Sequence, residues 1–279
     1  MISMREPAVA GSFYPEEQDK LAKMINEYLQ YAKVDETYSK EAKGFVAPHA
    51  GYIYSGRIAA YTYKAIYQYL QHKKVDTIVI IGPNHTGAGS LIAVSDEDWV
   101  TPFGIFNNDH EFTRALSKIK GIDINEAAHE EEHSIEVQLP FIQFISKDFD
   151  IKGVFICMLD QSYYSSELLA NAINKVKEDL EREIIVIASS DFNHYESAEI
   201  AKSKDLPAIE ALEKLDMLKF NDIIERVGDT ACGFGPITVA GLYAKMKGAS
   251  RGILLNYGNS GDINNDYSSV VAYASLIFV

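Results

Sequence analysis

The chain of 279 residues has few cysteines, few basic residues and no long apolar run. Two cysteines cannot build the disulfide framework of a small secreted protein, and no long apolar stretch follows the opening residues as it would in a secretory signal. No segment approaches about 18 consecutive apolar residues, so no transmembrane helix is expected. We therefore predict a cytoplasmic protein with no membrane partner.

Basic residues are outnumbered, with 26 Lys and Arg against 40 Asp and Glu and a net charge of −14. Nucleic-acid binding depends on neutralising phosphates with Lys and Arg, so this balance disfavours a nucleic-acid partner. The acidic residues are mostly scattered and are typical of solvated helix faces.

The length allows one large domain or two small ones. A single domain of this size buries roughly three quarters of its unfolded surface and needs neither disulfide nor metal to fold. No linker, repeat or low-complexity tract interrupts the sequence, so we predict one domain over residues 1–279.

Short apolar runs alternate with segments of helical periodicity. Runs without polar alternation predict strands buried on both faces of a sheet, and they lie at 44–51, 76–87, 152–160 and 183–194. Helices are predicted at 55–70, 109–119, 133–145, 166–181, 198–215, 218–227 and 236–247, two further strands at 250–260 and 268–279, and a β-excursion turning at 101–104. The pattern predicts a layered α/β fold with a central, largely parallel or mixed sheet flanked by helices.

Three of these strands end in residues that can do chemistry. His49 and His85 each follow a strand, and Asp191 and His194 follow a third. Ligands of open α/β sheets bind beyond the carboxyl ends of strands, so these side chains are expected to converge on one site. A single strand-end histidine could instead cap a helix or satisfy a buried carbonyl; three strands ending this way favour a site.

A second pair of histidines lies in the segment HEEEHSIEVQLPF. His129 and His133 have the spacing of two ligands on one helix face, but the three glutamates between them resemble a helix first turn. We therefore expect His129 in a solvated loop. His133 and Glu136 could both face the strand-end site, which the pattern alone leaves open. His72 and His110 are given no role.

The two cysteines differ in their surroundings. Cys157 lies inside an apolar strand and is expected in the core. Cys232 is followed by Gly233 and Gly235, which permit close backbone approach, and it precedes a predicted helix whose N-terminus would lower the pKa of the thiol. From the residues alone, Cys232 is equally well explained as a buried apolar side chain or as a reactive or metal-binding thiolate.

Seven short motifs occur in order across nearly the whole sequence and settle this ambiguity by resemblance. They are REPAVAGSFYP, APHAGYIYSG, IIGPNHTG, EHSIEVQLPF, SSDFNHY, ACGFGPI and YGNSGD. Together they resemble the Memo family, which includes an animal mediator of cell motility and the AmmeMemoRadiSam system protein B of bacteria and archaea. The family's fold is similar to that of class III extradiol ring-cleaving dioxygenases, which are non-haem Fe(II) enzymes.

The resemblance implies a metal site built from His49, His85 and Cys232. Fe(II) is the first expectation, with Cu(I) or Zn as alternatives. The dioxygenase relatives have a carboxylate where Cys232 stands. Because a thiolate is softer and itself oxidisable, this difference argues against ring cleavage as such.

The resemblance also implies residues around the metal. His133, Asp191 and His194 match the family's other pocket residues and are expected to be catalytic, with His194 as acid and base and Asp191 as its orienting partner or a neighbour of the metal. Tyr14, Tyr52 and Tyr54, together with Glu136, are expected to line the substrate pocket. Packing around tight turns is the alternative role for the tyrosines.

Three functions follow from these residues. The first is a redox-active iron or copper oxidoreductase of unknown substrate. The second is a metal- and peptide-binding module without turnover, whose implied partners are a radical SAM protein and an AMMECR-type protein, with a small molecule or peptide in the strand-edge pocket. The third is a hydrolase in which Cys232 is the nucleophile and His49 or His194 the base, or in which zinc activates water.

Overall fold

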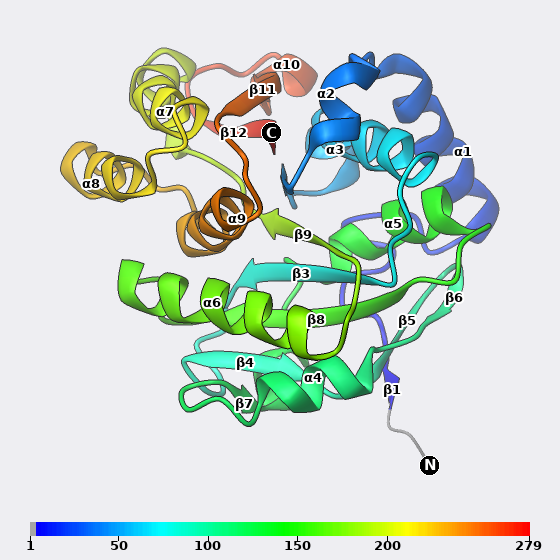
Figure 1. The fold of residues 1–279 in the computed structure, drawn as a ribbon. Helices are drawn as coiled ribbons and strands as arrows, with labels where there is room; N and C mark the ends of the chain where they lie inside the picture. The colour runs from blue at the N-terminus through cyan, green and yellow to red at the C-terminus, as the bar shows by residue number, and fades with distance from the viewer. Residues whose placement is uncertain (1–3) are drawn as a thin grey trace.

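In the computed structural model, which describes residues 4–279, nine strands form one mixed sheet (Figure 1). The strand order is β10-β12-β2-β9-β3-β8-β4-β7, and β11 pairs with β12. The central strands β2, β9, β3 and β8 are parallel, while β12 and β4 join them antiparallel on either side. A separate three-stranded sheet has the order β1-β5-β6. The prediction of a largely parallel or mixed sheet is confirmed.

Helices and strands alternate along the chain. The strands are β1 (Met4–Arg5), β2 (Gly44–Ala47), β3 (Thr77–Pro83), β4 (Ile92–Ser95), β5 (Asp98–Thr101), β6 (Gly104–Phe106), β7 (Asp123–Ile124), β8 (Lys152–Met158), β9 (Ile184–Ser189), β10 (His194–Glu196), β11 (Gly252–Asn259) and β12 (Val270–Phe278). The α-helices are α1 (Gln18–Tyr31), α2 (Glu36–Glu41), α3 (Tyr52–Leu70), α4 (His110–Leu116), α5 (Leu139–Ser146), α6 (Tyr163–Asp179), α7 (Ala198–Glu213), α8 (Met217–Val227), α9 (Phe234–Met246) and α10 (Gly261–Asn264). Short 3-10 helices span Glu126–Ala128 and Glu136–Gln138.

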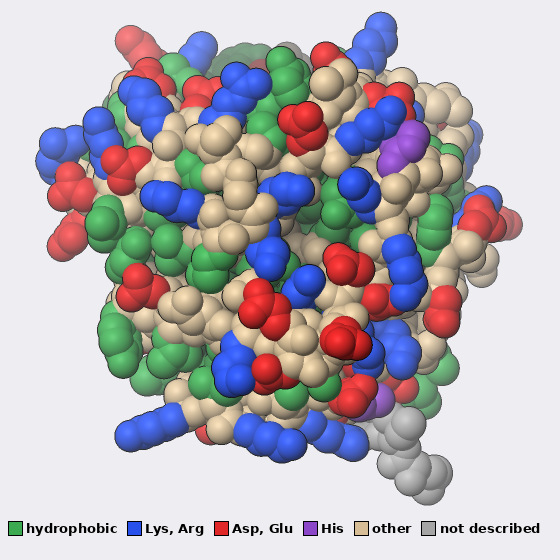
Figure 2. Space-filling model, viewed as in Figure 1, with side chains coloured by type: hydrophobic (Ala, Val, Ile, Leu, Met, Phe, Trp, Pro, Cys, Tyr) green, Lys and Arg blue, Asp and Glu red, His purple; other side chains and the backbone are tan. Residues whose placement is uncertain are grey.

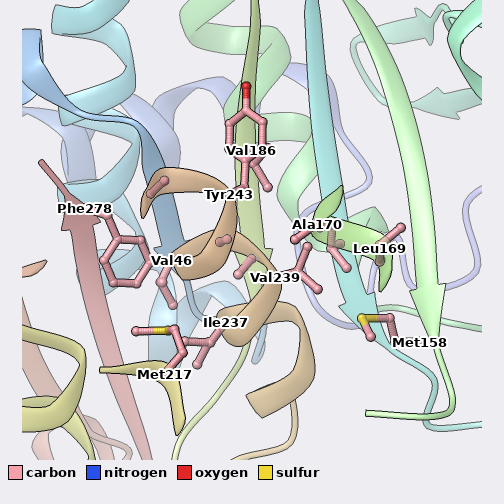
Figure 3. Close-up of a cluster of buried hydrophobic side chains, with 14 of the residues drawn as sticks. Val46, Met158, Leu169, Ala170, Val186, Met217, Ile237, Val239, Tyr243 and Phe278 are labelled. Carbon is pink, nitrogen blue, oxygen red and sulfur yellow. The ribbon is translucent and has the colours of Figure 1, made fainter. Parts of the chain in front are cut away.

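Two apolar clusters cover the two faces of the large sheet. Helices α4 and α6 to α9 contribute to one cluster, and α1, α3 and α5 to the other. Figure 3 shows part of the first, where Ile237 and Val239 of α9 gather with side chains from the sheet. Helix α9 is apolar on nearly all sides because it is buried between the sheet and its neighbouring helices.

Side-chain caps explain where several helices begin. An Asp or Ser side chain accepts a hydrogen bond from a first-turn backbone amide at the N-termini of α2, α4, α6, α7 and α8. These caps satisfy amides that have no partner within the helix.

Most predicted elements are present. The four strands predicted from apolar runs are β2, β3, β8 and β9, and the expected excursion is the β5–β6 hairpin. The helix predicted at 133–145 is wrong at its start. The chain forms turns and a 3-10 helix first, and α5 begins at Leu139, where Pro140 occupies the first turn that suits a residue without an amide hydrogen. Helix α1 and strand β4 were not predicted.

On the face shown in Figure 2, acidic and basic side chains are interspersed, as expected for solvated helix faces. Among residues 4–279, no helix is long and apolar enough to cross a membrane.

Candidate metal centre

The site lies at the carboxyl ends of three adjacent parallel strands. Strands β2 and β3 both pair with β9, so their ends lie at the same edge of the sheet. His49 follows β2, His85 follows β3, and Asp191 follows β9. Sheet pairing therefore brings together residues that are up to 142 positions apart in the sequence, and the predicted convergence of the strand ends is confirmed.

A cavity of about 480 Å³ opens at this edge. Its lining is Phe13, His49, Ala50, Gly51, His85, His133, Asp191, His194, Tyr195, Thr230, Cys232 and Val271. Within the part of the chain that the structure describes, no lysine or arginine lines it. Four histidines and a thiol thus share a cavity whose other walls are aromatic, aliphatic and glycine surface together with Asp191 and Thr230.

Three of the histidines form a compact group. One ring nitrogen each from His49, His85 and His133 can be chosen so that all three lie within 4.8 Å of one another. The ring centroids are 4.7 to 5.4 Å apart. The group ranges from buried His49 to exposed His85, so it is open to solvent on one side. This spacing is compatible with a single metal ion.

A hydrogen-bond chain fixes the tautomer of His49. The Ser189 hydroxyl donates to the Ser134 carbonyl at 2.6 Å, so at 2.8 Å it accepts from Nδ1–H of His49. The lone pair of His49 is therefore on Nε2, which lies 3.2 Å from Sγ of Cys232. Partners that hold one ring nitrogen so that the other can bind a metal are typical of metal-ligating histidines.

Glu132 orients the other two histidines. Its carboxylate accepts from Nδ1 of His85 at 2.9 Å and from the backbone amides of His85 and Ser134, and it lies 3.5 Å from Nδ1 of His133. Because a carboxylate only accepts, His85 must carry its proton on Nδ1, which leaves Nε2 free. Burial opposes ionisation of Glu132, but the hydrogen bond and charge of His85 outweigh it and lower the pKa of Glu132 to about 2.

Burial favours the neutral form of His49 and His133. Burial lowers the pKa of His49 well below its ordinary value, and the positive charges that His133, His85 and His194 would carry lower it further. Burial also lowers the pKa of His133, with Glu132 opposing. Neutral imidazoles are the form that binds metals, so no proton needs to leave His49 at neutral pH before binding.

Cys232 stands directly before helix α9, whose N-cap is Gly233. A Cβ on Gly233 would collide with the carbonyl oxygen of Ser189, so glycine is required for the loop to approach β9 this closely. The expected lowering of the thiol pKa is wrong for the metal-free protein. Burial and the charge of Asp191 raise the pKa of Cys232 more than the hydrogen bonds of the surrounding backbone and of Ser190 lower it. A thiolate at this position requires a bound cation.

Asp191 and His194 have different partners from those predicted. The Asp191 carboxylate accepts from the backbone amides of His49 and Ala50, at 2.8 and 3.3 Å, and not from His194. His194 is held by Thr230 instead: its amide donates to the Thr230 hydroxyl, and its Nδ1 lies 3.0 Å from the Thr230 carbonyl. Asp191 therefore orients the His49 backbone, and His194 presents Nε2 at the cavity mouth.

The four residues expected to line the substrate pocket lie elsewhere. Glu136 is fully buried, where it accepts from Arg5 and from the Tyr14 hydroxyl at 2.8 and 2.7 Å. Tyr52 is buried with its hydroxyl bonded to the Val137 carbonyl, and Tyr54 is exposed on α3. None of the four is part of the cavity lining; Tyr14 and Tyr52 pack in the core, which was the alternative role for the tyrosines.

His129 also differs from expectation, because it is fully buried rather than solvated. The Arg5 guanidinium donates to its carbonyl at 2.7 Å, and Trp99 contacts its ring edge. Burial and the charge of Arg5 lower the pKa of His129 to about 3. His129 is therefore a neutral packing residue apart from the site. Cys157 is buried as predicted.

Two residues of the site were missed by sequence reasoning. Glu132 was assigned to a helix first turn, and Ser189 was given no role. Both orient metal-facing histidines. The sequence feature that could have identified them is their closeness to predicted site residues. Glu132 directly precedes His133, and Ser189 stands two positions before Asp191.

Comparison with known proteins adds the family. Residues 5–277 match the family described as Memo-like protein. The chain is 42% identical to a MEMO1 family protein of Methanopyrus kandleri, covering 98% of each chain, and 44% identical to one of Methanococcus maripaludis, covering 98% of this chain and 99% of that one. A crystal structure of an uncharacterized Escherichia coli K12 protein aligns over 85% of this chain and 99% of that chain with a TM-score of 0.43 and 10% identity, too weak a likeness to carry an argument. The family model and the relatives, each spanning nearly the whole sequence, show that this chain belongs to the Memo family.

Proposed function

We propose that this chain is a redox-active, metal-dependent oxidoreductase. One observation carries the proposal: three histidines from separate segments converge within 4.8 Å, each facing the same cavity. We assign His49, His85 and His133 as ligands, and Cys232 as a fourth ligand recruited on loading. This keeps the two histidines and the cysteine predicted from the sequence and adds His133.

The donor set fits a transition metal. His49 and His85 direct Nε2 lone pairs into the site because Ser189 and Glu132 occupy their Nδ1 positions. Cys232 lies within hydrogen-bond reach of His49, so a small side-chain rotation suffices to exchange that contact for a metal bond. Imidazole and thiolate together favour iron, copper or zinc over magnesium or calcium.

Fe(II) is the first choice among these metals, with Cu(I) next and Zn after it. When bound, iron or copper would supply electron transfer and an open position for a small oxidant.

The protein supplies the remaining functions of the site. Asp191 holds the backbone at His49 and Ala50, so the ligand on β2 is fixed to the adjacent strand β9. His194, with Nδ1–H engaged by the Thr230 carbonyl, accepts a proton at Nε2 from a molecule in the cavity. Phe13, Tyr195 and Val271 contribute apolar surface to the cavity wall, and Phe13 packs against the ring of His133. A small molecule or a peptide side chain is the class of ligand proposed for this cavity, which has the volume of a small-molecule site.

Metal uptake tests the proposal. Protein purified without oxygen should bind about one equivalent of Fe(II) or Cu(I) per chain, measured by metal analysis after desalting. His49→Ala should abolish retention, while His72→Ala, which changes an exposed histidine on the surface, should leave it intact. Equal retention by wild type, His49→Ala and Cys232→Ser would refute the site.

A second candidate function is hydrolysis with Cys232 as the nucleophile. It is favoured by the 3.2 Å contact between Sγ of Cys232 and Nε2 of His49. His49 would accept the thiol proton, with Ser189 fixing its tautomer as the orienting residue does in a catalytic triad. This function predicts turnover of esters or thioesters that survives chelators, and an acyl-thioester at Cys232 detectable by mass spectrometry. Loss of all turnover with chelator would exclude it.

A further inference from the structure

A second buried polar cluster lies outside the metal pocket, around two contacting carboxyl groups. Asp205 of α7 is fully buried, and Asp229, in the loop after α8, is nine-tenths buried. The two side chains lie within hydrogen-bond reach of each other. Because two carboxylates can only accept, this contact requires a proton on one of them.

The remaining contacts of the pair come from neutral donors. Asp205 accepts from the Tyr257 hydroxyl at 2.6 Å and from the Asn193 amide at 3.1 Å, and Asp229 accepts from the Ala231 amide at 3.1 Å. Oδ2 of Asp229 has no other hydrogen-bond partner among the described residues, which a proton shared with Asp205 would supply.

Among residues 4–279, no basic side chain forms an ion pair with either aspartate. Its titratable and charged surroundings are Tyr257 of β11 with Asp262 of α10 beyond it, Glu196 of β10, Lys204 of α7, and His194, which faces Thr230. Lys204 binds Glu196 at 2.8 Å and the Gly228 carbonyl at 3.2 Å, so its charge is already matched. Two adjacent buried carboxylates with no cation cannot both ionise at neutral pH.

The pair lies at one end of a row of contacts that leads to the metal pocket. The segments 191–194 and 229–232 run together through three links. The Cys232 amide donates to the Asp191 carbonyl at 3.3 Å, Thr230 binds His194, and Asp229 reaches Asn193 through Asp205. The first two contacts hold Cys232 and His194 at the cavity. The third connects the aspartate pair to the same two segments.

We propose that Asp205 and Asp229 share one proton, and that this proton fastens the 229–232 loop to the 191–194 segment so that Cys232 and His194 keep their positions. The two aspartates are positioning residues, since neither lines the cavity. Loss of the proton places two like charges in contact, and the loop then detaches. The site is thereby coupled to pH through groups that do not bind the metal.

The direction of this coupling follows from burial. Burial, followed by the charge of Asp229, raises the pKa of Asp205 to about 8, and burial also raises the pKa of Asp229. A group whose pKa is higher folded than unfolded stabilises the fold fully below its unfolded pKa, and that contribution is lost as the pH rises toward the folded value. The shared proton therefore holds the loop most firmly at acidic pH, its contribution falls through neutral pH, and it is lost above about pH 8.

The test uses metal-free protein, so its result is independent of the proposed metal function. Cys157 is buried, so a thiol reagent such as dithionitrobenzoate reports on Cys232. Asp229→Asn supplies a permanent amide donor to Asp205 and should hold the loop at every pH. The wild-type rate divided by the rate of the Asp229→Asn variant should be close to one at acidic pH and should rise with pH to about tenfold above pH 8, the effect of losing one buried hydrogen bond. Ionisation of Cys232 itself cancels in this ratio.

Two further measurements make the test decisive. Asp229→Ala, which can neither donate nor accept, should react faster than Asp229→Asn at every pH. Infrared spectra of the wild type should contain a protonated carboxyl band at neutral pH that disappears at alkaline pH and is missing in Asp229→Asn. A rate ratio that does not change with pH, or a wild-type spectrum without that band, would overturn the proposal. Restoration of the slow wild-type rate at high pH by Mg²⁺ or Ca²⁺ would also overturn it, because the pair would then hold a cation.

Discussion

The two sides of the metal pocket are built by different means. On the strand side, His49 and Asp191 are placed by the pairing of β2 with β9, and their partners are a serine hydroxyl and backbone amides. On the loop side, His133 and Glu132 lie in a segment of turns without sheet pairing. This segment is held by a buried charge, because Arg5 donates to the Glu132 carbonyl and to the Glu136 carboxylate, at 2.8 Å each.

This difference indicates how each half of the ligand set keeps its geometry. Regular backbone pairing distributes the cost of ordering the strand side over many hydrogen bonds, so no single side chain there is essential for folding. The loop side has fewer backbone partners, and its order depends on one buried ion pair and the groups around it. Substitutions behind the loop should therefore affect stability, whereas substitutions beside the strands should affect mainly metal affinity.

The largest effect is expected from Glu136→Ala. The substitution leaves the Arg5 guanidinium buried without its carboxylate, and it removes the acceptor of the Tyr14 hydroxyl and of two backbone amides. Removing one partner of a buried pair typically costs about 3–5 kcal/mol in the free energy of unfolding. Urea unfolding of the metal-free protein measures this loss in the free energy of unfolding. The control is Lys20→Ala, which breaks the exposed pair with Glu17 and should change nothing measurable. If both variants were equally stable, the loop would have another source of order.

The strand side could be predicted from the sequence, and the loop side could not. Unbroken apolar runs mark buried parallel strands, and the carboxyl ends of such strands meet at one edge, so His49, His85 and Asp191 were expected together before any coordinates. The spacing of His129 and His133 suggested a helix face, but the segment is not a helix there, and His129 points into the core. No periodicity marks this segment.

The loop-side contacts also span too much sequence to be read locally. Arg5 reaches the Glu136 side chain across 131 residues, which nothing near either residue indicates. The pKa of Cys232 is a similar case. The helix that follows Cys232 is visible in the sequence, but the burial that raises the pKa of the thiol becomes known only from the packing. The sequence thus predicted that the side chains at the strand ends meet, and only the packing showed their protonation and their orienting partners.

An effect of intermediate size, on metal affinity, is expected from Glu132→Gln. This variant tests whether a side chain on the loop side also orients the metal-facing histidines. Glutamine keeps one acceptor for His85 but loses the negative charge that favours its Nδ1–H tautomer and that lies near His133. Loss of such an orienting carboxylate typically weakens metal affinity by about 10- to 100-fold. Competition titration with a chromogenic chelator measures the dissociation constant. Glu131→Gln, a change at an exposed neighbour, is the matched control. Unchanged affinity in Glu132→Gln would mean that Glu132 serves the fold alone.

The smallest effect is expected from Ser189→Ala on the strand side. The substitution removes the acceptor of Nδ1–H of His49, but sheet pairing and the Asp191 hydrogen bond still hold the backbone of that residue. The His49 ring should keep its position but lose its preference for one tautomer. Metal affinity should therefore fall about tenfold, which is the lower end of the range for loss of an orienting partner. Ser203→Ala, on the exposed side of α7, is the control in the same titration. A loss as large as that of Glu132→Gln would reverse the comparison, because side-chain orientation would then matter as much beside the strands as it does in the loop.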